Sequence, residues 1–282
     1  MEINKDLYEK LALQLDLPSL IQFSKCNKKF DKIFRNEQIW RNKLIADFSD
    51  YESLFLNKSL KNIYILLYNL KNLRNALNLR RNIYDLYNGI GSDNMYLYDR
   101  DLRQIPKTIG YLSNLQALYL HDNELSYIPK EIGNLSNLRL LYLHNNELRE
   151  LPKEIGKLSN LTELLLSNNQ FTQIPKEIMD LFNLEILYFF NNKITEIPKE
   201  IENLTNLRMF SMAYNKLSDI PKEIGNLYNL QQLFLENNNV TQLPKEIGNL
   251  SNLRRLSIFN NDIIDIPEEI QKGIIYQNLH NR

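Results

Sequence analysis

Leu118-Tyr119-Leu120-His121-Asp122-Asn123-Glu124-Leu125-Ser126-Tyr127-Ile128-Pro129 is one copy of a motif that recurs along most of this chain. Further copies begin at Leu141, Leu164, Leu187, Phe210, Leu233 and Leu256, and a weaker copy runs from Met95 to Pro106. The prolines that close the copies stand at positions 106, 129, 152, 175, 198, 221, 244 and 267, so the period is 23 residues throughout. A fixed period over eight copies indicates stacked, near-identical units, which is the signature of a solenoid.

The order of residues within each unit predicts its path. Leu118 and Leu120 predict a short strand with inward leucines, and a turn follows at Asn123. Pro129 is expected to be the first residue of a short helix, because its fixed φ suits that position and its missing N–H is not needed there. Gly133 is expected to help end this helix. Strands stack ~4.8 Å apart whereas helices need roughly 8–10 Å, so the stack must curve with the sheet on its concave side.

One asparagine in every unit is expected at the edge of the core. A buried amide without partners costs ~1–3 kcal/mol, so its side chain should bond backbone groups of its own and neighbouring turns. Seven such residues in register predict a hydrogen-bonded ladder between repeats, formed by Asn123, Asn146, Asn169, Asn192, Asn215, Asn238 and Asn261.

The full unit, Leu-x-x-Leu-x-Leu-x-x-Asn-x-Leu-x-x-Ile-Pro-Lys-Glu-Ile-Gly-x-Leu-x-Asn, resembles the leucine-rich repeat family. In particular, it is similar to the 23-residue class found in Ras-pathway scaffold proteins. The resemblance covers roughly residues 92–279. It implies an α/β solenoid shaped as a horseshoe over residues 93–282, with eight repeats and a truncated ninth. Its concave sheet would bind a target protein or peptide, and short helices would line its convex face.

The residues between the inward leucines point away from the core, towards the concave face. The core does not require aromatic side chains there, and contiguous exposed aromatic residues usually mark a binding surface. Cross-strand stacking that only stabilises the sheet is the alternative. The predicted protein-binding residues are Tyr96, Tyr98, Tyr119, His121, Tyr142, His144, Tyr188, Phe190 and Phe234.

Chemistry beyond binding has little support in the sequence. His121 and His144 lie one repeat apart and could ligate a metal ion, with Asp122 or Asp99 as the nearby candidates for a third ligand. We see no further ligand, and the sequence shows no Gly-rich phosphate loop and no nucleophile–base arrangement. We therefore predict no metal, no cofactor and no catalytic residues, and expect that the chain is not an enzyme.

Residues 1–47 predict a small helical module. Leu7, Leu11 and Leu15 recur at every fourth position, as on one face of a helix, and Asp16-Leu17-Pro18-Ser19 interrupts them. Further helices are expected around Leu20 and Phe23 and around Phe30, and Trp40 anchors the end.

Taken in order, these residues resemble an F-box. The segment from Leu20 to Phe30 stands where that family has Leu-x-x-Leu-Ser-x-Val-x-Lys-x-Trp, and Ile39-Trp40 follows at the expected distance. The sequence departs from the family at its start, where Ile3-Asn4 replaces Leu-Pro, and at Cys26 and Phe30, which replace Val and Trp. The resemblance implies that a Skp-type adaptor of a cullin ubiquitin ligase binds Leu7, Leu11, Leu15, Leu20, Phe23 and Trp40.

The alternative is a binding scaffold without a ubiquitin role, in which the N-terminal helices only cap the solenoid. Residues 48–92 are predicted to form a helical connector and cap, because apolar residues follow a helical period between positions 63 and 77.

Composition bounds the partners and the compartment. The chain has 34 basic and 34 acidic residues, which argues against nucleic acid or an anionic membrane as the main partner. The single cysteine, Cys26, excludes an internal disulfide and favours a reducing compartment. The polar N-terminus is not a signal peptide, and the apolar run from Ile63 to Tyr68 is too short for a membrane span. We expect an intracellular, cytoplasmic protein.

Overall fold

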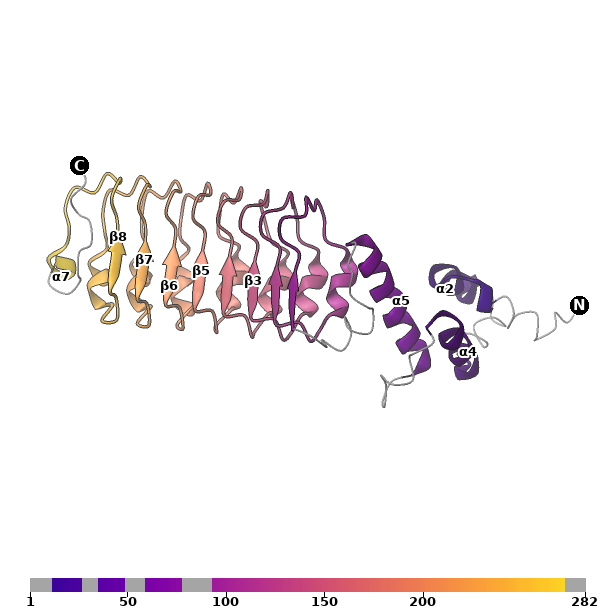
Figure 1. Ribbon diagram of the computed structural model, residues 1–282. Helices are drawn as coiled ribbons and strands as arrows, with labels where there is room; N and C mark the ends of the chain where they lie inside the picture. Colours follow the sequence, from indigo (N-terminus) through magenta and orange to yellow (C-terminus); the bar gives the residue numbers. More distant parts are fainter. Residues whose placement is uncertain (1–11, 27–34, 49–58, 78–92, 272–282) are drawn as a thin grey trace, which may run out of the picture. The chain divides into compact units, whose positions relative to one another are not determined.

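The structure is a computed structural model that describes residues 12–26, 35–48, 59–77 and 93–271 (Figure 1). The chain divides into two compact units, Met1–Ile90 and Gly91–Arg282. The first unit is helical and the second contains the repeats. Residues 272–282, where a truncated ninth strand was predicted, lie outside the described residues.

The repeat unit is built on one parallel sheet whose eight strands follow in sequence order (Figure 1). Each strand residue pairs with the residue 23 positions later, as Leu118 does with Leu141. The predicted solenoid with a parallel sheet is confirmed. Its strands are β1 (Asn94–Tyr96), β2 (Ala117–Tyr119), β3 (Leu140–Tyr142), β4 (Glu163–Leu165), β5 (Ile186–Tyr188), β6 (Met209–Ser211), β7 (Gln232–Phe234) and β8 (Arg255–Ser257).

A 3-10 helix connects each strand to the next, where the sequence predicted short helices on the convex side. In one such turn, the Ile132 N–H donates to the Pro129 carbonyl at 3.0 Å, which is the i to i+3 bond of a 3-10 helix. Five residues leave no room for an α-helix of useful length. The turns are η2 (Lys107–Tyr111), η3 (Lys130–Asn134), η4 (Lys153–Lys157), η5 (Lys176–Asp180), η6 (Lys199–Asn203), η7 (Lys222–Asn226) and η8 (Lys245–Asn249), and the short helix α7 (Glu268–Gln271) follows β8.

Two details of these turns differ from the sequence predictions. Pro129 has φ −66° and ψ 144° and lies just before the helix rather than at its first residue, so its C=O accepts the first helical bond. Gly133 lies inside η3, where a Cβ atom would stand 2.5 Å from the carbonyl oxygen of Glu154 in the next repeat. The reason for this glycine is therefore close packing between repeats and not helix termination.

The core of the repeat unit lies between the sheet and the 3-10 turns. Leu118 and Leu120 from the strand, Leu125 from the descending segment and Ile132 from the turn are all fully buried. The same places are filled by leucine, isoleucine or phenylalanine in the other repeats, for example by Phe171 and Phe189, whose rings meet edge to face at 5.5 Å. Within the residues that the structure describes, the opposite face of the sheet, turned away from the 3-10 turns, carries no such layer. We call it the open face; it is the face predicted to be concave.

The helical unit contains α2 (Leu17–Cys26), α4 (Glu37–Asp47) and α5 (Leu60–Ala76). Asn36 caps α4 by accepting the Gln38 N–H at 2.9 Å, and α5 with its C-cap residue Leu77 covers the helical period predicted between positions 63 and 77. Trp40 and Tyr64 lie at the centre of this unit, with ring centroids 5.4 Å apart. No helix among the described residues has the length and apolar character needed to cross a membrane.

Candidate functional site

Aromatic rings form two columns on the open face, along the first strands of the sheet. Tyr96 and Tyr119 stack in parallel with centroids 4.8 Å apart, and Tyr142 meets Tyr119 edge to face at 5.0 Å. Beside them, Tyr98 stacks on His121 at 4.7 Å. The strand register places these side chains on adjacent repeats, so the contacts follow from the fold. Tyr96 and Tyr98 are nearly half exposed, and the other members of the two columns are half-buried.

The parallel pairs Tyr96–Tyr119 and Tyr98–His121 cover one ring face with another, so these rings offer edges and polar atoms to solvent more than ring faces. Tyr142 donates a hydrogen bond of 2.5 Å to Glu163 on β4. Burial and the neighbouring Glu163 carboxylate raise the pKa of Tyr142, so its hydroxyl stays protonated. Burial likewise raises the pKa of Tyr119 and of Tyr188. The columns are therefore amphipathic, and they suit a ligand with both apolar groups and hydrogen-bonding groups.

The two predicted histidines are in direct contact. His121 and His144 stack with centroids 4.4 Å apart and planes 7° from parallel. Asp122 binds His121 Nδ1 at 2.7 Å and accepts the Asn145 amide at 2.6 Å, and the hydrogen bond from His121 lowers the pKa of Asp122. His144 is half-buried and its Nδ1 has no hydrogen-bond partner among the described residues; burial lowers its pKa.

One ligand atom each from His121, Asp122 and His144 lies within 4.8 Å of the others, so these residues offer a donor set for a metal ion. The stacked geometry argues against it, because lone pairs in two parallel ring planes cannot both point at one ion. Asp122 is also held by two hydrogen bonds already. This geometry agrees with the prediction from sequence that the chain binds no metal, which stays a prediction.

The remaining predicted contact residues lie further along the open face, and all three are half-buried. Tyr188 donates from its hydroxyl to the Met209 sulfur at 3.7 Å. Phe190 contacts the ring of Tyr214 at 4.9 Å, and the guanidinium of Arg255 lies 5.0 Å from the centre of the Phe234 ring. Aromatic residues thus occur along the sheet in two groups, one on the first three strands and one from β5 onwards. Leu165 on β4 and Ser167 in the loop after it separate the two groups.

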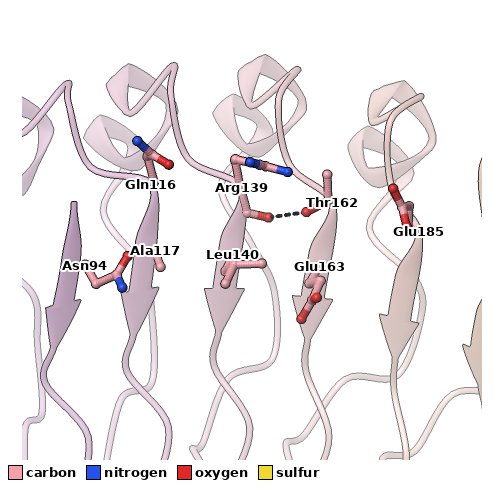
Figure 2. Close-up of a pocket in the computed structure, with 8 residues that line it drawn as sticks. All are labelled: Asn94, Gln116, Ala117, Arg139, Leu140, Thr162, Glu163 and Glu185. Atoms are coloured by element: carbon pink, nitrogen blue, oxygen red, sulfur yellow. Dashed lines mark hydrogen bonds between the residues drawn. The ribbon is translucent and has the colours of Figure 1, made fainter. Parts of the chain in front are cut away.

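A groove of about 290 Å³ crosses the N-terminal ends of the strands, beside the aromatic columns. Its walls carry both signs of charge. The Arg139 guanidinium makes no ion pair in the described part of the chain, and the Glu185 carboxylate pairs only at 3.5 Å with Arg208, so both groups are available to a ligand. Glu163 belongs both to the groove and to the tyrosine column. Figure 2 shows the lining residues, which are Asn94, Gln116, Ala117, Arg139, Leu140, Thr162, Glu163 and Glu185. These residues are not among the contact residues predicted from sequence, because their gathering into a groove depends on the strand register.

The seven asparagines of the predicted ladder all bond between repeats. Asn169 is representative, since its Oδ1 accepts the Leu148 N–H at 2.9 Å and its Nδ2 donates to the Leu143 carbonyl at 3.0 Å, both in the preceding repeat. Four members are fully buried, namely Asn146, Asn169, Asn192 and Asn238, and the other three are half-buried. These residues hold successive strands in register and so determine where the open-face side chains lie.

A second ladder, which the sequence did not reveal, runs through the residue before each of these asparagines. These residues have φ between 50° and 56°, a left-handed conformation that Asn and Asp tolerate better than other side chains. Asn145, Asn168 and Asn191 each donate to the side chain one repeat earlier at 2.6, 2.6 and 2.7 Å. Tyr214 interrupts this ladder with φ 55°, and the Nδ2 of Asn237 in the next repeat is buried without a partner among the described residues.

We expect Tyr214→Asn to stabilise the protein by roughly 1–2 kcal/mol. Relief of the left-handed strain is worth roughly 1–2 kcal/mol and restored ladder bonds about 1 kcal/mol, against roughly 1 kcal/mol for the lost contact with Phe190. Urea denaturation followed by circular dichroism measures the change. Tyr214→Phe keeps both the ring and the strain, so it should leave the midpoint unchanged. An unchanged or lower midpoint for Tyr214→Asn would contradict the strain argument.

The residues predicted to bind a Skp-type adaptor are only partly described. Leu20 and Trp40 are 2% and 1% exposed and pack inside the helical unit itself, so in this structure they do not offer a surface to a partner. Leu15 is half-buried. Leu7, Leu11 and the side chain of Phe23 lie outside the described residues. Ile45 on α4 is 55% exposed and is a large apolar side chain available on this unit.

Comparison with known families adds a second line of evidence for the repeats. The family described as "Leucine-rich repeat region" matches residues 127–233 and 196–279, and the family described as "Leucine rich repeat" matches residues 94–148. Neither match extends to residues 1–93, so the resemblance to an F-box stays a prediction, as does the resemblance to the Ras-scaffold class. No curated protein gives a significant match to this sequence.

Several solved structures are similar to this chain over its repeats. A leucine-rich repeat protein of Leptospira interrogans is 42% identical over 65% of this chain and 53% of its own, with a TM-score of 0.55. The plant peptide hormone receptor RGFR1, solved in complex with RGF2, is 40% identical over 60% of this chain and 28% of its own, with a TM-score of 0.55. An internalin C2 from Listeria monocytogenes is 25% identical over 70% and 86%, with a TM-score of 0.58. The chain thus spans about half the length of the Leptospira protein.

Proposed function

Because this chain belongs to the leucine-rich repeat family, we propose that it is a protein-binding module whose open face holds a target protein or peptide. The observation that carries this proposal is the continuous surface formed by the tyrosine and histidine columns and the groove beside them. The core does not need these rings, and half-exposed aromatic residues are enriched where proteins bind one another. The similarity to a peptide hormone receptor also supports a polypeptide as the ligand.

The chemistry of the surface favours a polypeptide over other ligands. Stacked rings present edges, which suit a backbone and mixed side chains better than a flat ligand that needs exposed ring faces. The groove offers Arg139 and Glu163 within one row of strands, so it can pair with both signs of charge. We also propose that the chain is not an enzyme, because among the described residues no side-chain hydrogen bond joins a nucleophile to His121, Asp122 or His144, the strongest constellation on the open face.

The test uses the full chain as bait for a phage library of random linear peptides. The affinity of a selected peptide is then measured by calorimetry. We expect the double variant Tyr119→Ala/Tyr142→Ala to bind it roughly 30-fold more weakly, as befits two central contact residues. Tyr228→Ala is the matched control, because Tyr228 is 58% exposed but lies between η7 and β7, outside the sheet. Equal affinities for the double variant and the wild type, with both folded, would rule out the columns as the binding surface.

The finer proposal is that the helical unit recruits a ubiquitin ligase, so that the chain acts as an F-box-like substrate adaptor. The alternative is a binding scaffold without that role. Co-precipitation of the full chain with a purified Skp-type adaptor distinguishes them. Ile45→Asp is the informative variant because it changes an exposed apolar residue and should leave the unit folded. If the intact chain does not bind the adaptor, the scaffold alternative stands.

A further inference from the structure

We propose that Tyr214, Phe190 and Glu236 form a contact site for a positively charged side chain of the bound polypeptide. This inference rests on the proposed function, because it specifies one feature of the ligand held on the open face. It concerns the middle of the sheet, away from the tyrosine and histidine columns of the first three strands.

The aromatic part of the site comes from Tyr214, whose ring takes the place on the open face that the side chain of Ala213 leaves empty. Phe190 and Glu236 occupy the same column of the open face, and Ala213 lies between them. Ala213 is small and fully buried, and the ring of the next residue, Tyr214, contacts Phe190 at 4.9 Å. Tyr214 is nonetheless 47% exposed. It thus supplies the open face with an accessible ring at a repeat whose column position has none.

This ring is kept at a cost in stability. Tyr214 adopts φ 55°, and the other repeats carry Asn or Asp at this position. An Asn or Asp side chain can make the hydrogen bonds of the second ladder, and a tyrosine ring cannot. In the described part of the chain, the Nδ2 atom of Asn237 is left buried without a partner. Asparagine would remove both defects, so packing of the isolated chain does not account for tyrosine. Strained, under-satisfied positions of this kind are concentrated at functional sites.

The charge of the expected ligand follows from Glu236. The Tyr214 N–H donates to the Glu236 carbonyl at 2.9 Å, so the two residues are neighbours on adjacent repeats, with Glu236 itself in register with Ala213. The Oε2 atom of Glu236 is buried and has no hydrogen-bond partner among the described residues. Arg255, a cation of the open face one strand further on, lies over the Phe234 ring and makes no ion pair with Glu236. A carboxylate oxygen without a donor is costly, and Glu236 as a whole is only half-buried, so a ligand can approach this residue from solvent.

A lysine or arginine side chain satisfies both halves of the site. Its charge pairs with the Glu236 carboxylate, and its cationic end lies against the exposed Tyr214 ring, an arrangement that aromatic rings favour. An apolar side chain would use the ring but leave the carboxylate oxygen unpaired. An acidic side chain would be repelled by Glu236. The site therefore selects for positive charge.

The experiment extends the peptide selection to this site. Wild type, Glu236→Gln and Tyr214→Asn chains serve as baits, with Tyr228→Ala as the control. Peptides selected by the wild type should share a Lys or Arg at one position. A selected peptide should bind Glu236→Gln roughly tenfold more weakly. Its analogue with Met in place of the basic residue should lose a similar factor against the wild type, and should lose nothing further against Glu236→Gln.

This design separates two failures. Peptides that bind the wild type, weaken with the Tyr119→Ala/Tyr142→Ala variant and show no basic residue would overturn the charge selection and leave the binding function intact. Equal binding to the wild type and to Glu236→Gln would do the same. A wild-type chain that selects no peptide would count against the binding function itself. Weaker peptide binding by Tyr214→Asn together with its higher stability supports a role in ligand contact, since a structural tyrosine would lose stability when replaced.

Discussion

Asn169→Ala should lower the free energy of unfolding by about 2–4 kcal/mol, the largest effect we expect from a single polar substitution in this chain. The Asn169 amide makes four hydrogen bonds, to the Leu148 N–H at 2.9 Å and to the carbonyls of Leu143, Leu166 and Ser167 at 3.0, 3.2 and 3.2 Å. It is 4% exposed, so water cannot replace these bonds without opening the repeat. The Leu148 N–H in particular would be left buried and unpaired.

Urea denaturation followed by circular dichroism measures this effect. Asn183→Ala is the matched control, because Asn183 makes one exposed inter-repeat bond, to the Ser159 carbonyl at 2.8 Å, and should cost no more than about 1 kcal/mol. Asn169→Asp tests the mechanism, since a carboxylate still accepts from Leu148 but cannot donate to three carbonyls. Similar midpoints for Asn169→Ala and Asn183→Ala would contradict the buried ladder. A broadened transition for Asn169→Ala is also expected, because a weak central repeat uncouples the two ends of a solenoid.

Gly225→Ala should destabilise the protein by about 2–3 kcal/mol through overpacking. A Cβ atom at this position would lie 2.5 Å from the Glu246 carbonyl oxygen and 2.6 Å from the Glu246 Cβ. Both are atoms of the next repeat that cannot rotate away, so the two 3-10 turns would have to move apart. That movement weakens the packing of the core beneath them.

Gly156→Ala is the control with the same chemistry in a looser place. Its Cβ would stand 3.0 Å from the Glu177 carbonyl and 3.2 Å from the Asp180 carboxylate, which can rotate. We expect a change within about 1 kcal/mol, because the reduced freedom of the unfolded chain offsets a mild contact. Met179 and Glu202 occupy the same place in two other repeats, so this position does not demand glycine everywhere. Equal losses for Gly225→Ala and Gly156→Ala, measured by the same urea titration, would show that inter-repeat spacing is not the cause.

The residue pattern alone predicts much of the architecture. The 23-residue spacing of the prolines predicted the first eight strands and their order, and the alternating leucines predicted which side chains are buried. Both predictions succeed because each repeat has the same neighbours, so one local pattern is tested many times in a single chain. The positions of the open-face aromatic residues followed from the same alternation.

Other features were out of reach of a residue pattern. The 3-10 form of the turns and the purpose of Gly133 depend on how closely two repeats approach. The second ladder and the strain at Tyr214 depend on a backbone angle, which residue types in order do not report. The N-terminal module shows the limit most plainly, because a single copy of spaced leucines left its packing ambiguous. Leu20 and Trp40 were assigned to a partner surface but lie inside their own unit.

By itself, the sequence determined the solenoid, its register and the identity of the residues on the open face, since these follow from a period repeated eight times. Only the tertiary structure decided which of those residues touch: the stacked histidines, the groove around Arg139, the unpaired oxygen of Glu236 and the accessible ring of Tyr214. The physical reason is that periodicity specifies the direction of a side chain. Contact, burial and hydrogen-bond satisfaction are determined by distances between repeats, and those distances exist only in the folded stack.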